Sequence, residues 1–94
     1  MMNEEGNLVI TGKRSYIDII ADLVKCAIGG IRKTKLLYST NLNQPTLEKY
    51  LKIAIRSGLI AVEKRGSVLV FRTTGKGLEF LELYRRLRSL LTLQ

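Results

Sequence analysis

Apolar residues recur at intervals of three and four along four segments of this chain, the spacing that places them on one face of an α-helix. The pattern predicts helices at about residues 16–28, 33–40, 43–57 and 75–93. Between the last two of these helices the chain carries two β-rich runs, at 59–64 and 67–72. Arg65 and Gly66 lie between the runs, which predicts a β-hairpin that turns at this pair.

Two of the predicted helices have clear start signals. Ser15 has the chemistry of an N-cap, and Asp18 follows three residues later, near the positive end of the helix dipole. Asn43 is the corresponding N-cap of the third helix, in which Pro45 is tolerated in the first turn. Gly58 supplies the end of that helix.

The helical spacing also predicts which side chains face the core. In the first helix these are Tyr16, Ile19, Ile20, Leu23, Val24 and Ala27. In the second they are Leu36, Leu37 and Tyr38, and in the third Leu47, Leu51, Ala54 and Ile55. Residues 8–10 are expected to form a short edge strand or a frayed arm, and residues 31–32 a link that can pair as a brief strand.

The order helix, short link, helix, tight turn, helix, hairpin, helix is that of a winged helix-turn-helix. We therefore expect an α+β protein with three core helices, a two-stranded wing hairpin and a long C-terminal dimerisation helix. The expected segments are an N-terminal arm at 1–12, a winged-helix DNA-binding domain at 13–73 and a dimerisation helix at 74–94. In this architecture the second helix of the motif, here 43–57, enters the major groove.

The charge of the chain indicates the kind of partner that it binds. The 94 residues carry 16 Lys and Arg against 8 Asp and Glu, a net charge of +8. The segment 30–72 contains nine basic residues and two acidic ones, so the excess is concentrated in the middle of the chain. A polyanion is the natural partner and nucleic acid the commonest one, although a basic surface also serves solubility or an anionic membrane.

Several classes of function are disfavoured by composition. The chain has no histidine, which removes the commonest general base and metal ligand, so we expect no enzyme, no metal and no cofactor. Cys26 is the only cysteine and cannot form an internal disulfide, which indicates an intracellular protein. The sequence contains no membrane-length apolar run and no leader pattern at its start, so we expect a cytoplasmic, nucleoid-associated protein.

A helical wheel centred on Leu51 predicts the face that the third helix turns outward. The candidate DNA contacts of this recognition helix are Asn43, Gln44, Pro45, Thr46, Lys49, Lys52, Ile53 and Arg56. Lysine and arginine can bind phosphates, arginine can read guanine, and Ile53 can meet a thymine methyl group. The alternative is an ordinary solvated helix face.

The hairpin and the second helix offer further cations. The candidate wing contacts are Lys64, Arg65, Ser67 and Arg72, which would follow the sugar-phosphate backbone or enter the minor groove. The candidate phosphate clamp consists of Lys13, Arg14, Arg32, Lys33 and Lys35, of which the last three lie where a helix start exposes backbone N–H groups. The alternative for the wing is a hairpin charged for solubility, and for Lys13 and Arg14 a basic arm.

The last predicted helix carries more apolar residues than a small core requires. Phe80, Tyr84, Leu87 and Leu91 are spaced as in a coiled-coil seam, and Leu83 broadens the apolar surface. We therefore expect a dimer interface, most simply of antiparallel helices, made by Leu78, Phe80, Leu81, Tyr84, Leu87, Leu90 and Leu91. The alternative is a helix folded back over its own domain.

Several runs resemble archaeal winged-helix DNA-binding proteins that have a C-terminal coiled coil. The similar runs are 14–22, 30–35, 41–43, 50–51, 58–60, 72–77, 80–81 and 84, in this order. The resemblance implies a homodimer held by the last helix, DNA bound by the recognition helix and wing, and a chromatin-architectural or regulatory role in an archaeal cell or its virus. The last helix stops at Gln94, earlier than in the longer members of that family.

These observations predict a dimeric protein that binds double-stranded DNA as a transcription regulator or a chromatin component. The second hypothesis is a winged-helix module that binds other proteins and no nucleic acid, because a fold does not determine a function.

Overall fold

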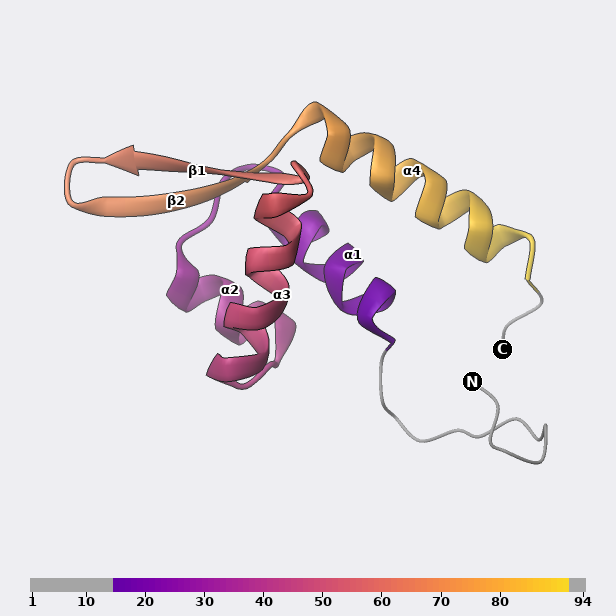
Figure 1. Cartoon of the computed structure of the whole chain (residues 1–94), viewed down its shortest axis with the longest axis horizontal. Helices are drawn as coiled ribbons and strands as arrows, with labels where there is room; N and C mark the ends of the chain where they lie inside the picture. The colour runs from indigo at the N-terminus through magenta and orange to yellow at the C-terminus, as the bar shows by residue number, and fades with distance from the viewer. Residues whose placement is uncertain (1–14, 92–94) are drawn as a thin grey trace.

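The structure, a computed structural model, describes residues 15–91 of the chain. Within them the elements are α1 (Tyr16–Cys26), α2 (Lys33–Thr40), α3 (Gln44–Arg56), β1 (Ile60–Arg65), β2 (Val68–Thr73) and α4 (Gly75–Ser89). Figure 1 shows α1 at the centre, α2 and α3 beside it, and the hairpin and α4 extending in opposite directions. The predicted α+β winged helix-turn-helix is confirmed. The predicted arm at 1–12 lies outside the described residues.

The start of α1 is a capping box, as Ser15 and Asp18 predict. The amide of Asp18 donates to the Ser15 hydroxyl at 3.2 Å, and the amide of Ser15 donates to the Asp18 carboxylate at 3.2 Å. Because each side chain satisfies an N–H group that has no partner in the helix, the start is well defined. The start of α3 is defined in the same way, since the amide of Thr46 donates to the Asn43 side chain at 2.9 Å.

The end of α1 differs from the prediction. The helix stops at Cys26 and not at 28, and Ala27 is its C-cap, with an amide that donates to the Leu23 carbonyl at 3.1 Å. The chain then turns at Gly30, whose φ is 88°, and reaches Ile31. Ile31 forms an isolated antiparallel bridge with Phe71, so the brief pairing expected for 31–32 is confirmed.

The core lies where the three core helices meet the base of the hairpin. Its largest fully buried side chains are Leu23, Val24, Leu36, Leu47 and Ile60. Two side chains predicted to face inward are exposed instead, Tyr16 and Tyr38. Tyr38 follows the buried Leu36 by two residues, about 200° around the helix, which turns it to solvent. Tyr16 is the first residue of α1, and its side chain is 57% exposed.

The hairpin is antiparallel, with Val62 opposite Phe71 and Arg65 opposite Val68. Its loop is therefore Gly66 and Ser67, one residue later than the predicted pair. Gly66 has a φ of 62°, a conformation that glycine adopts without the steric cost that a β-carbon brings. Glycine at the first loop position is the preference of a type II′ turn, which matches the twist of the strands.

The start of the last helix is hydrogen-bonded to the end of α3. Its N-cap Thr74 accepts from the amide of Gly77 at 3.0 Å and donates to the Gly58 carbonyl at 2.6 Å. Lys76 donates to the Ser57 carbonyl at 2.7 Å. α4 ends at Ser89, four residues before the predicted end at 93, and residues 90 and 91 form a turn.

Candidate nucleic-acid interface

The outer face of α3 is open to solvent, while Leu47, Leu51 and Ala54 on its inner face are buried. Six of the predicted contacts on the helix are exposed, and Thr46 is partly buried. The six are Gln44, Pro45, Lys49, Lys52, Ile53 and Arg56, next to the exposed N-cap Asn43. The ammonium group of Lys49 lies 5.3 Å from the centre of the Tyr50 ring, a cation–π contact that orients it.

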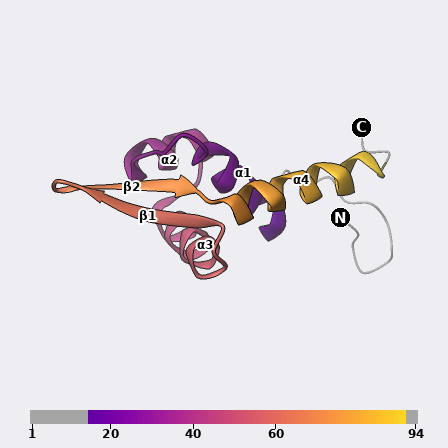
Figure 2. The same cartoon turned by 90° about the horizontal axis from the view of Figure 1, so that it is seen from above.

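The tip of the hairpin carries a second group of exposed polar side chains, Lys64, Arg65 and Ser67. Figure 2 shows the hairpin as a narrow ribbon that extends beyond α2 and α3, so these side chains lie at one end of the molecule. Arg65 makes one long contact with Glu63, at 3.5 Å, between two exposed side chains. A pair of this kind is worth little in water, so Arg65 remains available to another anion.

Two predicted contacts are already paired with carboxylates of the same chain. Arg72 is half-buried and donates from Nε to both carboxylate oxygens of Glu63, each at 3.1 Å. Lys33 donates to Glu48 at 2.7 Å, which links the start of α2 to α3. Sequence reasoning named the cations and missed both acidic partners. The strand register could have indicated the Glu63–Arg72 pair, whereas the Lys33–Glu48 pair joins two helices and has no signal in the sequence.

The start of α2 carries the described part of the predicted phosphate clamp. Arg32 and Lys35 are exposed, the Arg32 N-cap makes no side-chain capping bond, and the first turn contains no acidic residue. Backbone N–H groups at such a helix start are open to an anion. Lys13 and Arg14, the other predicted members of the clamp, lie outside the described residues.

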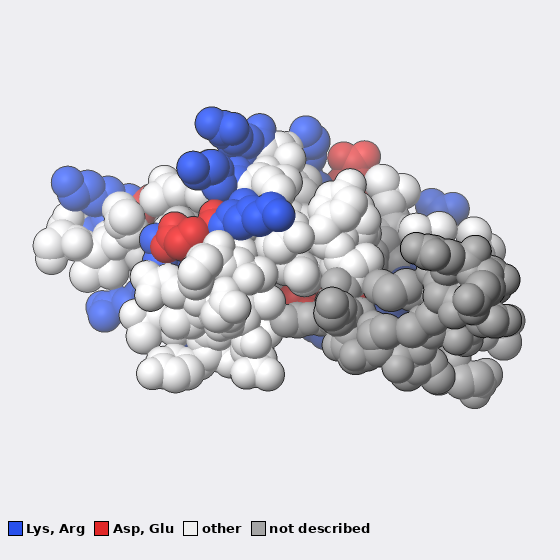
Figure 3. Space-filling model, turned by 60° about the horizontal axis from the view of Figure 1, so that its bottom comes forward, with Lys and Arg blue, Asp and Glu red and all other residues white. Residues whose placement is uncertain are grey.

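The cations of α3 and of the hairpin can be followed together in Figure 3, whereas α2 lies on the other side of the hairpin from α3 (Figure 2). In Figure 3 lysine and arginine side chains gather over α3 and at the hairpin end, with few acidic side chains among them. Within residues 15–91, no ion pair is formed by Arg32, Lys35, Lys49, Lys52, Arg56 or Lys64. The surface therefore has the uncompensated positive charge that a phosphate backbone requires.

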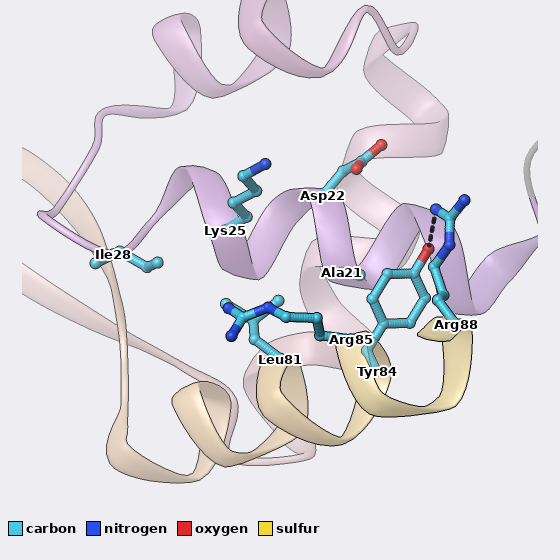
Figure 4. A pocket seen from close by; sticks show the side chains of 8 residues that line it. All are labelled: Ala21, Asp22, Lys25, Ile28, Leu81, Tyr84, Arg85 and Arg88. Carbon is cyan, nitrogen blue, oxygen red and sulfur yellow. Dashed lines mark hydrogen bonds between the residues drawn. The ribbon is translucent and has the colours of Figure 1, made fainter. Parts of the chain in front are cut away.

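α1 and α4 pack against each other, and Figure 4 shows a pocket between them. Tyr84 of α4 donates a hydrogen bond to the Asp18 carboxylate, and Arg88 donates to the Tyr84 hydroxyl at 3.3 Å. Between the helices lies a hollow of about 430 Å³, lined by Ala21, Asp22, Lys25, Ile28, Leu81, Tyr84, Arg85 and Arg88. Phe80 and Leu81 pack against the core, so this face of α4 is used within the chain.

The bond between Tyr84 and Asp18 lowers the pKa of that carboxyl below its ordinary value, with a smaller opposing effect of burial. A lowered folded-state pKa contributes stability above the unfolded pKa of about 3.9, and the contribution is lost as the pH falls through the folded value. Tyr84→Phe should lower the free energy of unfolding by about 1 kcal/mol at pH 7. Urea unfolding at several pH values should show the difference shrinking below about pH 4. A constant difference down to about pH 2 would contradict this explanation.

Five leucines of the C-terminal segment are exposed: Leu78, Leu83, Leu87, Leu90 and Leu91. At about 100° per residue, the last four lie on one flank of the helix, whereas Leu78 lies nearly opposite them. Of the seven predicted interface residues, Phe80, Leu81 and Tyr84 are partly buried within the chain, and the other four are exposed.

Within residues 15–91, no group of three or more histidine, cysteine or carboxylate side chains could hold a metal ion. None of the helices in this part of the chain has both the length and the apolar character of a membrane span.

Comparison with known proteins agrees with the architecture. Nine chains among the solved structures match this one. One is Sso10a-2, described as a DNA-binding protein from Sulfolobus solfataricus, with a TM-score of 0.69 and 20% sequence identity. The match covers 81% of this chain and 83% of that one. Curated protein sequences contain no match. The winged helix-turn-helix family matches residues 13–92, nearly the whole chain, and the protein belongs to this family.

Proposed function

We propose that this protein binds double-stranded DNA as a homodimer, with α3 in the major groove and the hairpin tip on the backbone or in the minor groove. The observation that carries the proposal is the exposed face of α3, where Lys49, Lys52 and Arg56 project without a carboxylate partner among the described residues. Helices that enter the major groove present such a face, since cations bind the phosphates on either side of the groove.

Two further observations support the proposal. The hairpin tip adds Lys64 and Arg65, and the start of α2, which Lys33 links to α3, adds Arg32 and Lys35. Sso10a-2, which has a similar fold, is described as a DNA-binding protein.

The chemistry of α3 favours general over sequence-specific binding. Its exposed face carries three cations, whereas Gln44 and the partly buried Thr46 are its polar uncharged side chains. Phosphate contacts position a protein on DNA and do not by themselves read sequence. We therefore propose a chromatin-architectural role, or a regulator whose specificity depends on few base contacts, in the nucleoid of an archaeal cell.

The test is the salt dependence of binding to a labelled DNA duplex, measured by fluorescence anisotropy from about 50 to 300 mM salt. Each phosphate contact adds about 0.9 to the slope of log K against log salt, so the cations of one protomer should give a slope of about −4 to −6. A flat response or no binding would overturn the proposal. It would instead favour a winged-helix module that binds other proteins.

The homodimer is proposed from the exposed flank of α4. Leu83, Leu87, Leu90 and Leu91 form an exposed apolar strip along one flank of the helix toward its C-terminal end. Two such strips, packed as antiparallel helices, would remove this surface from water, and a two-fold axis would present two α3 helices to one duplex.

Sedimentation equilibrium tests the dimer. The full chain should have twice the monomer mass, and Leu83→Glu with Leu87→Glu should give a monomer, because two charges would be buried in the seam. Leu78→Glu is the matched variant on the opposite flank and should remain a dimer. A monomeric wild-type chain, or a dimer that survives the double substitution, would refute the proposed seam.

A further inference from the structure

A groove runs between α3 and the hairpin, next to the cations of the proposed interface. It has a volume of about 410 Å³, and its walls are Lys33, Glu48, Leu51, Lys52, Ile55, Arg56, Val62, Leu69 and Phe71. The deeper part is apolar, and Phe71 at its base is buried. Lys52 and Arg56 lie along the α3 wall, where both are exposed.

Two apolar side chains that line this groove, Val62 and Leu69, are exposed to solvent. Val62 is 43% exposed and Leu69 is 48% exposed. The register places Lys64 opposite Leu69 and Val62 opposite Phe71, so all four project from the same face of the hairpin. Alternating positions on the other face carry the Glu63–Arg72 ion pair. The two exposed large apolar side chains of the hairpin therefore both lie on the face that looks toward α3.

The charges of the groove favour an anion. Glu48 is its only carboxylate among the described lining residues, and Lys33 neutralises it at 2.7 Å. Lys52 and Arg56 have no ion-pair partner within residues 15–91. A ligand that fits must carry negative charge along one edge and present carbon atoms on the other.

The sugar-phosphate backbone of a DNA duplex has these two properties, and the proposed binding mode brings it to this groove. A single sugar-phosphate strand separates the major groove from the adjacent minor groove. If α3 lies in the major groove and the hairpin tip lies in the adjacent minor groove, that strand must pass between α3 and the hairpin. The space between α3 and the hairpin is the groove described above.

We infer that one DNA strand runs through this groove, with its phosphates on Lys52 and Arg56 and its deoxyribose carbon atoms on Val62 and Leu69. The inference rests on the proposed DNA binding and adds a non-ionic component to it. Removing the two apolar side chains from water supplies affinity that does not depend on counterion release.

The first test replaces the apolar contacts without changing charge. Val62→Thr with Leu69→Thr keeps strand-forming side chains, and Val68→Thr on the other face of the hairpin is the matched control. The double variant should bind duplex DNA about three- to tenfold more weakly, with an unchanged salt slope, because about half of each side chain remains to be buried. The control should bind like the wild type, and Lys52→Ala should reduce the salt slope by about one.

The outcomes separate this inference from the proposed function. If the wild type binds with a steep salt slope and the double variant binds equally well, the inference fails and DNA binding stands. A double variant with a shallower slope also overturns the inference, since its loss would then be electrostatic. If the wild type does not bind, both proposals fail.

The second test needs no variant. In the complex of the wild-type chain with a short DNA duplex, the methyl groups of Val62 and Leu69 should show nuclear Overhauser effects to deoxyribose protons, and those of Val68 should not. Absence of these effects in a complex that forms would overturn the inference even if the double variant failed to fold.

Discussion

The triple variant Lys49→Ala, Lys52→Ala and Arg56→Ala should bind duplex DNA about a hundredfold more weakly than the wild type at about 0.15 M salt. Each lost phosphate contact removes about 0.9 from the salt slope, which corresponds to about a fivefold loss of affinity at that concentration. The slope should therefore fall by nearly three. All three side chains are exposed, so the free energy of unfolding should change little.

A charge-matched variant shows whether the loss belongs to α3. Lys25→Ala, Arg85→Ala and Arg86→Ala remove the same charge from exposed positions of α1 and α4. Because these positions lie on other elements than the proposed interface, affinity and slope should stay close to those of the wild type. Equal losses in the two triple variants would mean that net charge, and not the α3 face, governs binding. No loss in either would place the interface elsewhere.

The largest effect on stability is expected at Gly77. A β-carbon built on this residue would lie 2.3 Å from the Leu59 carbonyl oxygen and 2.7 Å from the Thr73 methyl carbon. The first of these atoms belongs to the backbone, so relief requires α4 to move away from the end of α3. Gly77→Ala should therefore lower the free energy of unfolding by about 3 kcal/mol and the Tm by more than about 10 °C.

Gly75→Ala is the matched control in the same turn of α4. A β-carbon there meets no atom within 4 Å, and alanine is the better helix former, so its Tm should be equal to or higher than that of the wild type. Thermal unfolding followed by circular dichroism measures both variants. A Gly77→Ala protein as stable as the control would show that α4 does not need this close approach.

The parts predicted most closely from sequence were those determined by neighbouring residues. The Ser15 and Asn43 caps, the bounds of α2 and the pairing near Ile31 all agree with the structure. A cap depends on side chains within three residues of the helix start, and the helical repeat determines which side of α3 is buried. The exposed cations of the proposed interface could be found for the same reason.

Other features depend on elements far apart in the chain. The hairpin turn lies one residue later than predicted, because its place depends on how β1 pairs with β2 and on the left-handed conformation of Gly66. Lys33 is paired with Glu48 on another helix, which a list of basic residues does not reveal.

The contrast between what the sequence determines and what the tertiary structure determines is clearest in α4. Its sequence alone determined that the helix carries more apolar residues than one contact surface requires, because leucine and aromatic residues occur on nearly every side of it. Only the tertiary structure decided which of them pack within the chain. Phe80, Leu81 and Tyr84 meet the core and α1, and Leu83, Leu87, Leu90 and Leu91 remain exposed. The reason is physical: periodicity specifies the relative directions of side chains on a helix, whereas the contact of Gly77 with Leu59 and the bond from Tyr84 to Asp18 determine which stretch of α4 packs against its neighbours. Leu87 and Leu91 continue the stripe of Phe80 and Tyr84 toward the end of the helix, where they are exposed.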